Sequence, residues 1–139
     1  MLEELKVVAK ANDLEEQVIF KGKLPYNEMM KYTTASDVGI SFDKNTNINY
    51  KFSLPNKLFD YIHAGIPVMV TDLVEIKRIV EDYKVGVVLA ELTPQTIAIN
   101  IERLRLKTSV YDEFKENTKR AKQELTWANE KEVLRTIYA

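Results

Sequence analysis

The chain has 139 residues, 45% hydrophobic and 29% charged, a composition typical of one globular domain with a single core. Its 20 basic and 21 acidic residues leave a formal net charge of −1 without a long block of either sign, which excludes the electrostatic signature of a nucleic-acid-binding protein. With no cysteine and a single histidine, the sequence offers no disulfide framework and no metal site, so we expect no metal and a reducing, cytoplasmic location.

The first predicted helix runs from Met1 to about Ala11. Its apolar residues fall at steps of three and four, the spacing of one helix face: Leu2, Leu5, Val8 and Ala9. Charged residues interrupt this segment throughout. It therefore matches neither a signal peptide nor a membrane span.

Residues 17–22 (QVIFKG) and 37–42 (DVGISF) are short β-branched and aromatic runs, and both are predicted to be buried strands. Gly22 ends the first run. Between the two runs, Pro25 near a helix start and the inner-face residues Met29, Met30 and Tyr32 predict a helix. Residues 43–53 are polar and rich in asparagine, follow neither the helix nor the strand period, and are predicted to form a loop.

A second half with the same alternation follows this loop. Pro55 after Ser53 predicts a helix start in which Ser53 caps the free amides, and the helix should end at Ala64 with Gly65 as a left-handed C-cap. Residues 67–71 (PVMVT) and 85–90 (VGVVLA) are predicted strands, with a helix over 72–83 between them. Helices are also predicted over 93–106, 109–125 and 128–138, the last with Asn129 and Glu132 at capping-box spacing.

Four apolar strands that alternate with helices predict an α/β fold, a Rossmann-like doubly wound parallel sheet with helices on both faces. Ligands of such sheets bind outside the carboxyl ends of the strands, which directs attention to the segment after residues 37–42. There, the free amides of a helix start suit a phosphate, with Ser53, Asn56 and Lys57 as added donors. Asp60, one turn beyond Asn56, is placed to accept hydrogen bonds from a ribose diol.

Three segments in this order carry a resemblance to a known family: VIFKGKLPYNEMMKYTTASDVGI, SLPNKLFDYIHAGIPVMVTD, and a late TW before a final helix. Together they resemble the C-terminal, donor-binding half of GT-B glycosyltransferases of the group 1 (GT4-like) type, in the subgroup with a PNK signature. The match covers nearly the whole chain. Residues 1–139 are therefore expected to form a single partial domain of this type.

The resemblance implies a retaining hexosyltransferase that uses a UDP- or GDP-sugar and extends a polysaccharide, such as a capsule, or a lipid-linked glycan. The start of the helix from Ser53 and Leu54 through Asn56 and Lys57 would face the diphosphate, and Asp60 would contact the ribose. Lys21 and Gly22 would lie near the base. No catalytic residue and no cofactor besides the nucleotide-sugar substrate are implied. A separate N-terminal acceptor domain would bind the glycan or lipid-linked acceptor and hold the enzyme peripherally at the inner membrane.

The chain departs from the family at two points. Phe52 stands where many members carry the first of two acidic residues, and Asp60 is a shortened form of the second. The first two strands of the family domain have no counterpart before Met1, and these would separate residues 17–22 from residues 37–42 in the sheet. Either these two segments pair directly, or another chain fills the gap, which makes a homo-oligomer a prediction; catalysis by this chain alone is not expected.

Other interpretations remain open on the sequence. The alternative function is a non-catalytic module of the same fold that pairs with a separate acceptor domain. A receiver-like signalling domain shares the alternating pattern, but its paired acidic residues are missing beside Asp43. Lys57 is also read as a surface lysine, and Asp60 as a solvated helix residue or a partner for Lys57. Asp43 is read as a solvated loop residue, although it could approach a donor sugar, and His63 as a packed residue rather than a base.

Overall fold

The sheet at the centre of the domain has three parallel strands in the order β1-β2-β3. They are β1 (Gly39–Ser41), β2 (Val68–Thr71) and β3 (Gly86–Leu89), and Ile40, Met69 and Val87 lie in register across them. The structure is a computed structural model and describes residues 1–106 and 108–138. The central strand β2 is apolar at successive positions because it is covered on both faces, as parallel sheets require.

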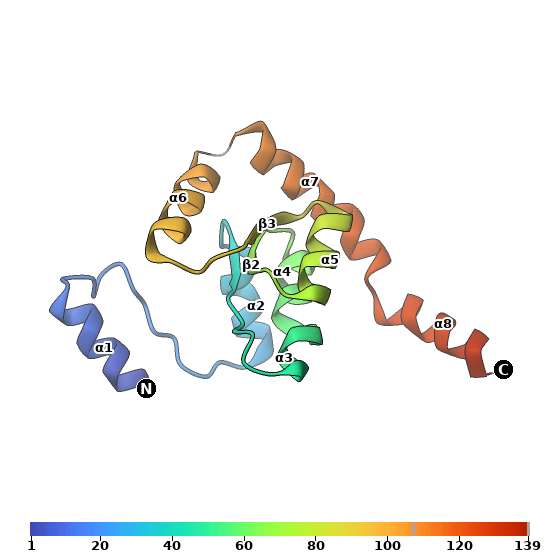
Figure 1. Cartoon of the computed structure of the whole chain (residues 1–139), viewed down its shortest axis with the longest axis horizontal. Helices are drawn as coiled ribbons and strands as arrows, with labels where there is room; N and C mark the ends of the chain where they lie inside the picture. Colours follow the sequence, from blue (N-terminus) through green and yellow to red (C-terminus); the bar gives the residue numbers. More distant parts are fainter. Residues whose placement is uncertain (107, 139) are drawn as a thin grey trace.

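Helices lie on both sides of the sheet, and the first and last helices project away from it (Figure 1). They are α1 (Leu2–Ala11), α2 (Tyr26–Thr34), α3 (Ile48–Phe52), α4 (Asn56–Ala64), α5 (Val74–Tyr83), α6 (Pro94–Arg105), α7 (Ser109–Glu124) and α8 (Trp127–Tyr138). Gly65 ends α4 in the left-handed conformation that the sequence predicts, with φ of 78°. The alternation of strand and helix from β1 to α6 confirms the α/β fold class.

The main core lies between one face of the sheet and helices α4, α5 and α7. Val68 and Val70 of β2 point into it. The helices contribute fully or nearly fully buried side chains: Leu58, Ile62, Ile76, Ile79, Val80 and Ala121. On the opposite face of the sheet, Met69 is fully buried and Leu104 of α6 is buried nearby. Helices thus cover both faces, as predicted.

Glycine permits the closest contacts of the sheet. A Cβ atom on Gly86 would overlap with the backbone carbonyl of Val68 in the neighbouring strand. A Cβ on Gly39 would overlap with the ring of Tyr61 in α4. The missing side chains therefore let α4 and the strands approach each other more closely than any larger residue would allow.

The predicted strand over residues 17–22 is wrong. The segment has no strand conformation, and the side chains of Val18 and Ile19 are 40% and 66% exposed. The outer side of β1, where it would pair directly, is occupied by Tyr61, whose hydroxyl donates to the backbone oxygen of Ile40 at 3.1 Å. Strand-forming residues do not make a strand without a backbone partner, and here the nearest sheet edge is covered.

Smaller corrections concern the helices. The predicted loop over 43–53 contains α3, which begins where the side chain of Asn47 accepts a hydrogen bond from the amide of Tyr50 at 3.0 Å. The capping box at Asn129 is wrong as well. The hydroxyl of Thr126 accepts from the amide of Asn129 at 3.2 Å, and α8 begins at Trp127, one residue earlier than predicted.

The first and last helices lie at opposite sides of the molecule (Figure 1). Ala9 is the buried residue of α1, and α8 buries none of its described residues. Trp127 and Tyr138 of α8 are 72% and 84% exposed. Over residues 1–106 and 108–138, no helix has the length and apolar character needed to span a membrane.

Candidate functional site

A polar cluster centred on Asp43 lies at the carboxyl ends of β1 and β2. The hydroxyl of Ser41, a fully buried residue, donates to Oδ2 of Asp43 at 2.7 Å. Lys57 Nζ in the first turn of α4 lies 3.2 Å from each carboxylate oxygen of Asp43. Charge-assisted hydrogen bonds of this kind fix the direction of both side chains.

The backbone around Asp43 is held by the neighbouring strand. Thr71, the last residue of β2, donates through Oγ1 to the backbone oxygen of Asp43 at 2.9 Å. The same hydroxyl lies 3.3 Å from the backbone oxygen of Ser41. The cluster therefore joins β1, β2 and α4 at the sheet edge where ligands of such folds bind.

The α4 N-terminus begins beside this cluster without a side-chain cap. Its N-cap is Pro55, and no side chain accepts a hydrogen bond from the first turn. The prediction that Ser53 caps α4 is wrong, because the Ser53 hydroxyl instead donates to the backbone oxygen of Tyr50 at the end of α3, at 3.1 Å. The Leu58 amide donates to the backbone oxygen of Pro55 at 3.1 Å, whereas the amides of Asn56 and Lys57 precede the first intrahelical acceptor and keep their partial positive charge.

Asp60 lies one turn further along α4 and faces α2. Its Oδ1 accepts a hydrogen bond from the hydroxyl of Tyr26, the first residue of α2, at 2.9 Å. This bond to the carboxylate raises the pKa of Tyr26 above its ordinary value, and the charge of Asp60 acts in the same direction. The alternative reading of Asp60 as a partner for Lys57 is wrong, since Lys57 bonds Asp43.

The adjacent Tyr61 belongs to α4, and its side chain lies against β1. Burial raises the pKa of its hydroxyl, and the charge of Asp60 raises it further. A neutral hydroxyl that donates to a backbone carbonyl is therefore the stable form at neutral pH.

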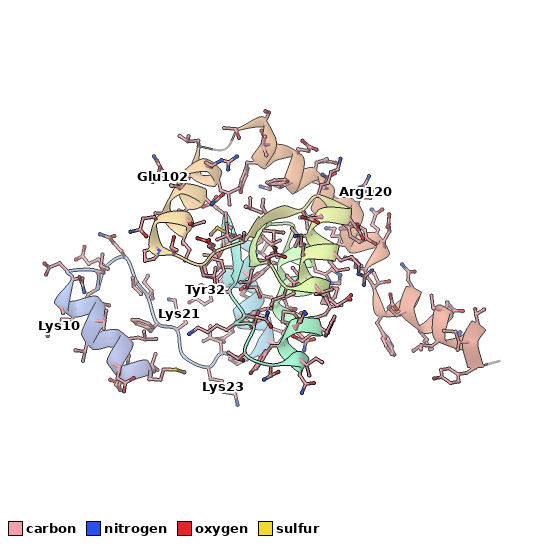
Figure 2. All side chains as sticks on the ribbon, in the orientation of Figure 1. Lys10, Lys21, Lys23, Tyr32, Glu102 and Arg120 are labelled. Atoms are coloured by element: carbon pink, nitrogen blue, oxygen red, sulfur yellow. The ribbon has the colours of Figure 1, made fainter. Side chains whose placement is uncertain are left out.

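Lys21 and Gly22 lie in a separate hollow beside α2 and the start of β1. This hollow has a volume of about 600 Å³ and is also lined by Tyr32, Gly39 and Tyr61. Figure 2 shows Lys21 beside Tyr32, and the Lys21 ammonium nitrogen is 4.6 Å from the ring centroid. The structure does not bring these two residues to Lys57.

Asn56 and Lys57 also face different surroundings. Asn56 lines a groove of about 1000 Å³ on the helical side of the molecule, together with Leu54, Phe59, Tyr83 and Trp127. His63 lines the same groove, and its Nε2 lies 2.8 Å from the backbone oxygen of Leu125. That contact agrees with a packing role for His63.

The chain matches a known protein-family model over most of its length. The model of the glucosyltransferase 3-like C-terminal domain matches residues 2–129. The chain belongs to this family. Its description indicates a glycosyltransferase domain, in agreement with the resemblance seen in the sequence. No curated protein and no solved structure matches the chain significantly.

The glucosyltransferase 3-like domain thus has its polar cluster where sequence reasoning placed the candidate site, but with a different centre. Asp43 was read as a solvated loop residue, whereas its side chain is only 20% exposed and has three fixed contacts. Its position just after a strand was the available signal. Among residues 1–106 and 108–138, no group of three or more His, Cys, Asp or Glu side chains is arranged to hold a metal ion.

Proposed function

We propose that this glucosyltransferase 3-like domain binds a nucleotide-diphospho-sugar of the UDP or GDP type for transfer to a polysaccharide or lipid-linked glycan acceptor. The observation that carries the proposal is the uncapped start of α4 beside Lys57, at the carboxyl ends of β1 and β2. Family membership supports the glycosyl-transfer chemistry, and this location supports the donor as the ligand of the domain.

The diphosphate is the part of the donor that α4 would hold. Free amides at a helix start point toward a ligand and carry the positive end of the helix dipole, which favours phosphate. The ammonium of Lys57 adds a cation that is 42% exposed and therefore reachable by a ligand. During transfer, this arrangement would stabilise the negative charge that grows on the departing nucleotide diphosphate.

The nucleoside would lie toward α2. Oδ1 of Asp60 already accepts from Tyr26, and an ionised carboxylate has further acceptor positions for the two hydroxyls of a ribose. Lys21 and Gly22 line the hollow beside α2 and the start of β1, which is the place we propose for the base. We place the reaction in the cytoplasm, as a retaining hexosyl transfer of the GT-B type.

Transfer also requires an acceptor domain, and the exposed helices indicate where such a domain would contact this one. Apolar side chains of α8 lie in solvent, among them Trp127, Ile137 and Tyr138. Exposed apolar surface of this kind marks interaction sites. An N-terminal acceptor domain that covers α8 would complete the enzyme and bring the glycan, at the membrane if it is lipid-linked, to the donor.

A second candidate is a non-catalytic module of the same fold. It is favoured by Phe52, which is half-exposed at the position where many related enzymes carry a carboxylate. Such a module would bind its partner domain without binding a donor. Nucleotide binding therefore separates the two candidates.

The test is isothermal titration calorimetry of the 139-residue chain with UDP and with GDP. The proposal predicts saturable binding of one of them, abolished by competition with the corresponding nucleotide-sugar. A folded protein that binds neither nucleotide would contradict the proposal and support the non-catalytic module.

A further inference from the structure

We infer that Asp43 recognises the hydroxyl groups of the donor sugar and so determines which sugar the domain accepts. The inference rests on the proposed function, because it needs a nucleotide-sugar at the start of α4. It goes beyond that proposal by naming the residue that distinguishes the sugar from the nucleotide to which it is attached.

Position is the first argument. Asp43 follows β1 by two residues and contacts Lys57 at 3.2 Å, in the first turn of α4. In a nucleotide-sugar, the sugar is bonded directly to the terminal phosphate. A diphosphate held by Lys57 and the α4 amides therefore has its sugar ring next to the carboxylate that contacts Lys57.

Orientation is the second argument. The carboxylate of Asp43 is fixed from the buried side by the Ser41 hydroxyl at 2.7 Å and laterally by Lys57. The main chain of Asp43 is fixed by Thr71 at 2.9 Å. A group that is already held in one direction loses little further freedom when a ligand binds, so its hydrogen bonds contribute more of their strength to affinity.

Acceptor capacity is the third argument. Ser41 and Lys57 donate to the carboxylate, which offers about four lone-pair positions in all. The side chain is 20% exposed, so it is reachable from solvent. An ionised carboxylate can only accept hydrogen bonds, which matches the donor hydroxyls of a pyranose and opposes a second phosphate.

The alternative role for Asp43 is to position Lys57 for the diphosphate. The two roles differ in what they do to UDP alone. A residue that contacts the sugar changes the affinity for UDP-glucose and leaves the affinity for UDP unchanged. A residue that acts through Lys57 weakens UDP and UDP-glucose by the same factor.

The experiment measures the binding of UDP, UDP-glucose, GDP and GDP-mannose to the full chain and to Asp43→Asn, which keeps the size of the side chain. We expect the nucleotide-sugar that binds the wild type to bind Asp43→Asn roughly tenfold more weakly, equivalent to about 1.4 kcal/mol. The corresponding nucleotide should bind within twofold of the wild-type value. Ser41→Ala, which removes one fixing bond, should show a smaller loss restricted to the nucleotide-sugar.

The matched control is Asp72→Asn. Asp72 follows β2 directly and pairs with Lys77 at 3.2 Å, so it is a carboxylate–lysine pair of the same length at the same edge of the sheet. Its substitution should change neither affinity. Spectra with native amide dispersion for each variant establish that the comparison is between folded proteins.

Two outcomes would overturn the inference while the donor site stands: an equal loss of nucleotide and nucleotide-sugar affinity in Asp43→Asn, or no loss of either. Failure of the wild type to bind any of the four ligands would instead overturn the proposed function, and the inference with it. The two failures are therefore distinguishable.

Discussion

Lys57 Nζ lies 3.2 Å from Oδ2 of Asp43, and the two residues are 14 positions apart in the chain. The ion pair joins the first turn of α4 to the segment that leaves β1. Because Lys57 is 42% exposed, the pair contributes little to the stability of the fold. Its significance is geometric, since it places an ammonium group and a carboxylate together at the sheet edge where ligands of such folds bind.

Lys57→Met should weaken nucleotide binding without unfolding the domain. Loss of a charged contact to the diphosphate is expected to lower the affinity by roughly tenfold or more, while the free energy of unfolding changes by less than about 1 kcal/mol. Calorimetric titration and urea unfolding measure the two quantities. The control is Lys77→Met, which breaks the pair with Asp72. Equal loss of affinity in both variants would show that Lys57 has no specific role.

Gly86→Ala should strongly destabilise the domain. The added Cβ would overlap with the backbone carbonyl of Val68, which cannot rotate away as a side chain can. We expect a loss of about 3 kcal/mol or more in the free energy of unfolding. Gly22→Ala is the control: its Cβ meets open space, so only the positive φ of 65° opposes the change, at about 1–2 kcal/mol. Urea unfolding that ranked Gly22→Ala as the more harmful change would contradict this packing.

Tyr61→Phe should alter stability in a way that depends on pH. Burial raises the pKa of Tyr61 in the folded state above the value of about 10 in the unfolded chain. The stabilisation is therefore complete below pH 10 and is lost as the pH rises through the folded-state pKa, because only the unfolded chain releases the proton readily. The variant should lose about 1 kcal/mol at neutral pH from the bond to Ile40.

Above pH 10, the stability of Tyr61→Phe should fall less steeply than that of the wild type. Tyr26 and Tyr83 also have raised pKa values, so some slope remains. Urea unfolding between pH 8 and about pH 11 gives both curves, over the range in which tyrosine titrates. Parallel curves would mean that Tyr61 is as solvated in the folded chain as in the unfolded one.

Trp127 provides a direct report on α8. It is the one tryptophan of the chain and is 72% exposed. We expect its fluorescence to be quenched by iodide nearly as efficiently as that of a free tryptophan derivative. Protection that disappears on dilution would show that a second copy of the chain covers α8. Protection at every dilution would contradict the exposed position of this helix.

The sequence predicted those parts of the fold that depend on local pattern. The continuous apolar run of residues 67–71 predicted a strand of a parallel sheet, and β2 is buried at Val68, Met69 and Val70. Gly65 predicted the end of α4, because a left-handed C-cap favours glycine. These features need no knowledge of distant contacts.

The errors arise where the outcome depends on a partner elsewhere in the chain. Val18 and Ile19 have strand-forming side chains, but a strand needs a neighbouring edge, and Tyr61 covers the side of β1. The pairing of Lys57 with Asp43 rather than Asp60 also depends on tertiary structure, because the helix and the strand end meet only after folding. Sequence spacing alone favours Asp60 as the partner of Lys57, because the two residues lie three positions apart in one helix.

The central claim is that the start of α4 binds a nucleotide diphosphate, and NMR titration with UDP and GDP tests it most directly. The amide signals of Asn56, Lys57 and Leu58 are the reporters, with those of α8 as an internal reference. We predict saturable shifts at these amides for one nucleotide, with little change in α8. Signals that stay fixed at the start of α4 in a folded protein, or saturable shifts confined to another surface, would contradict the account.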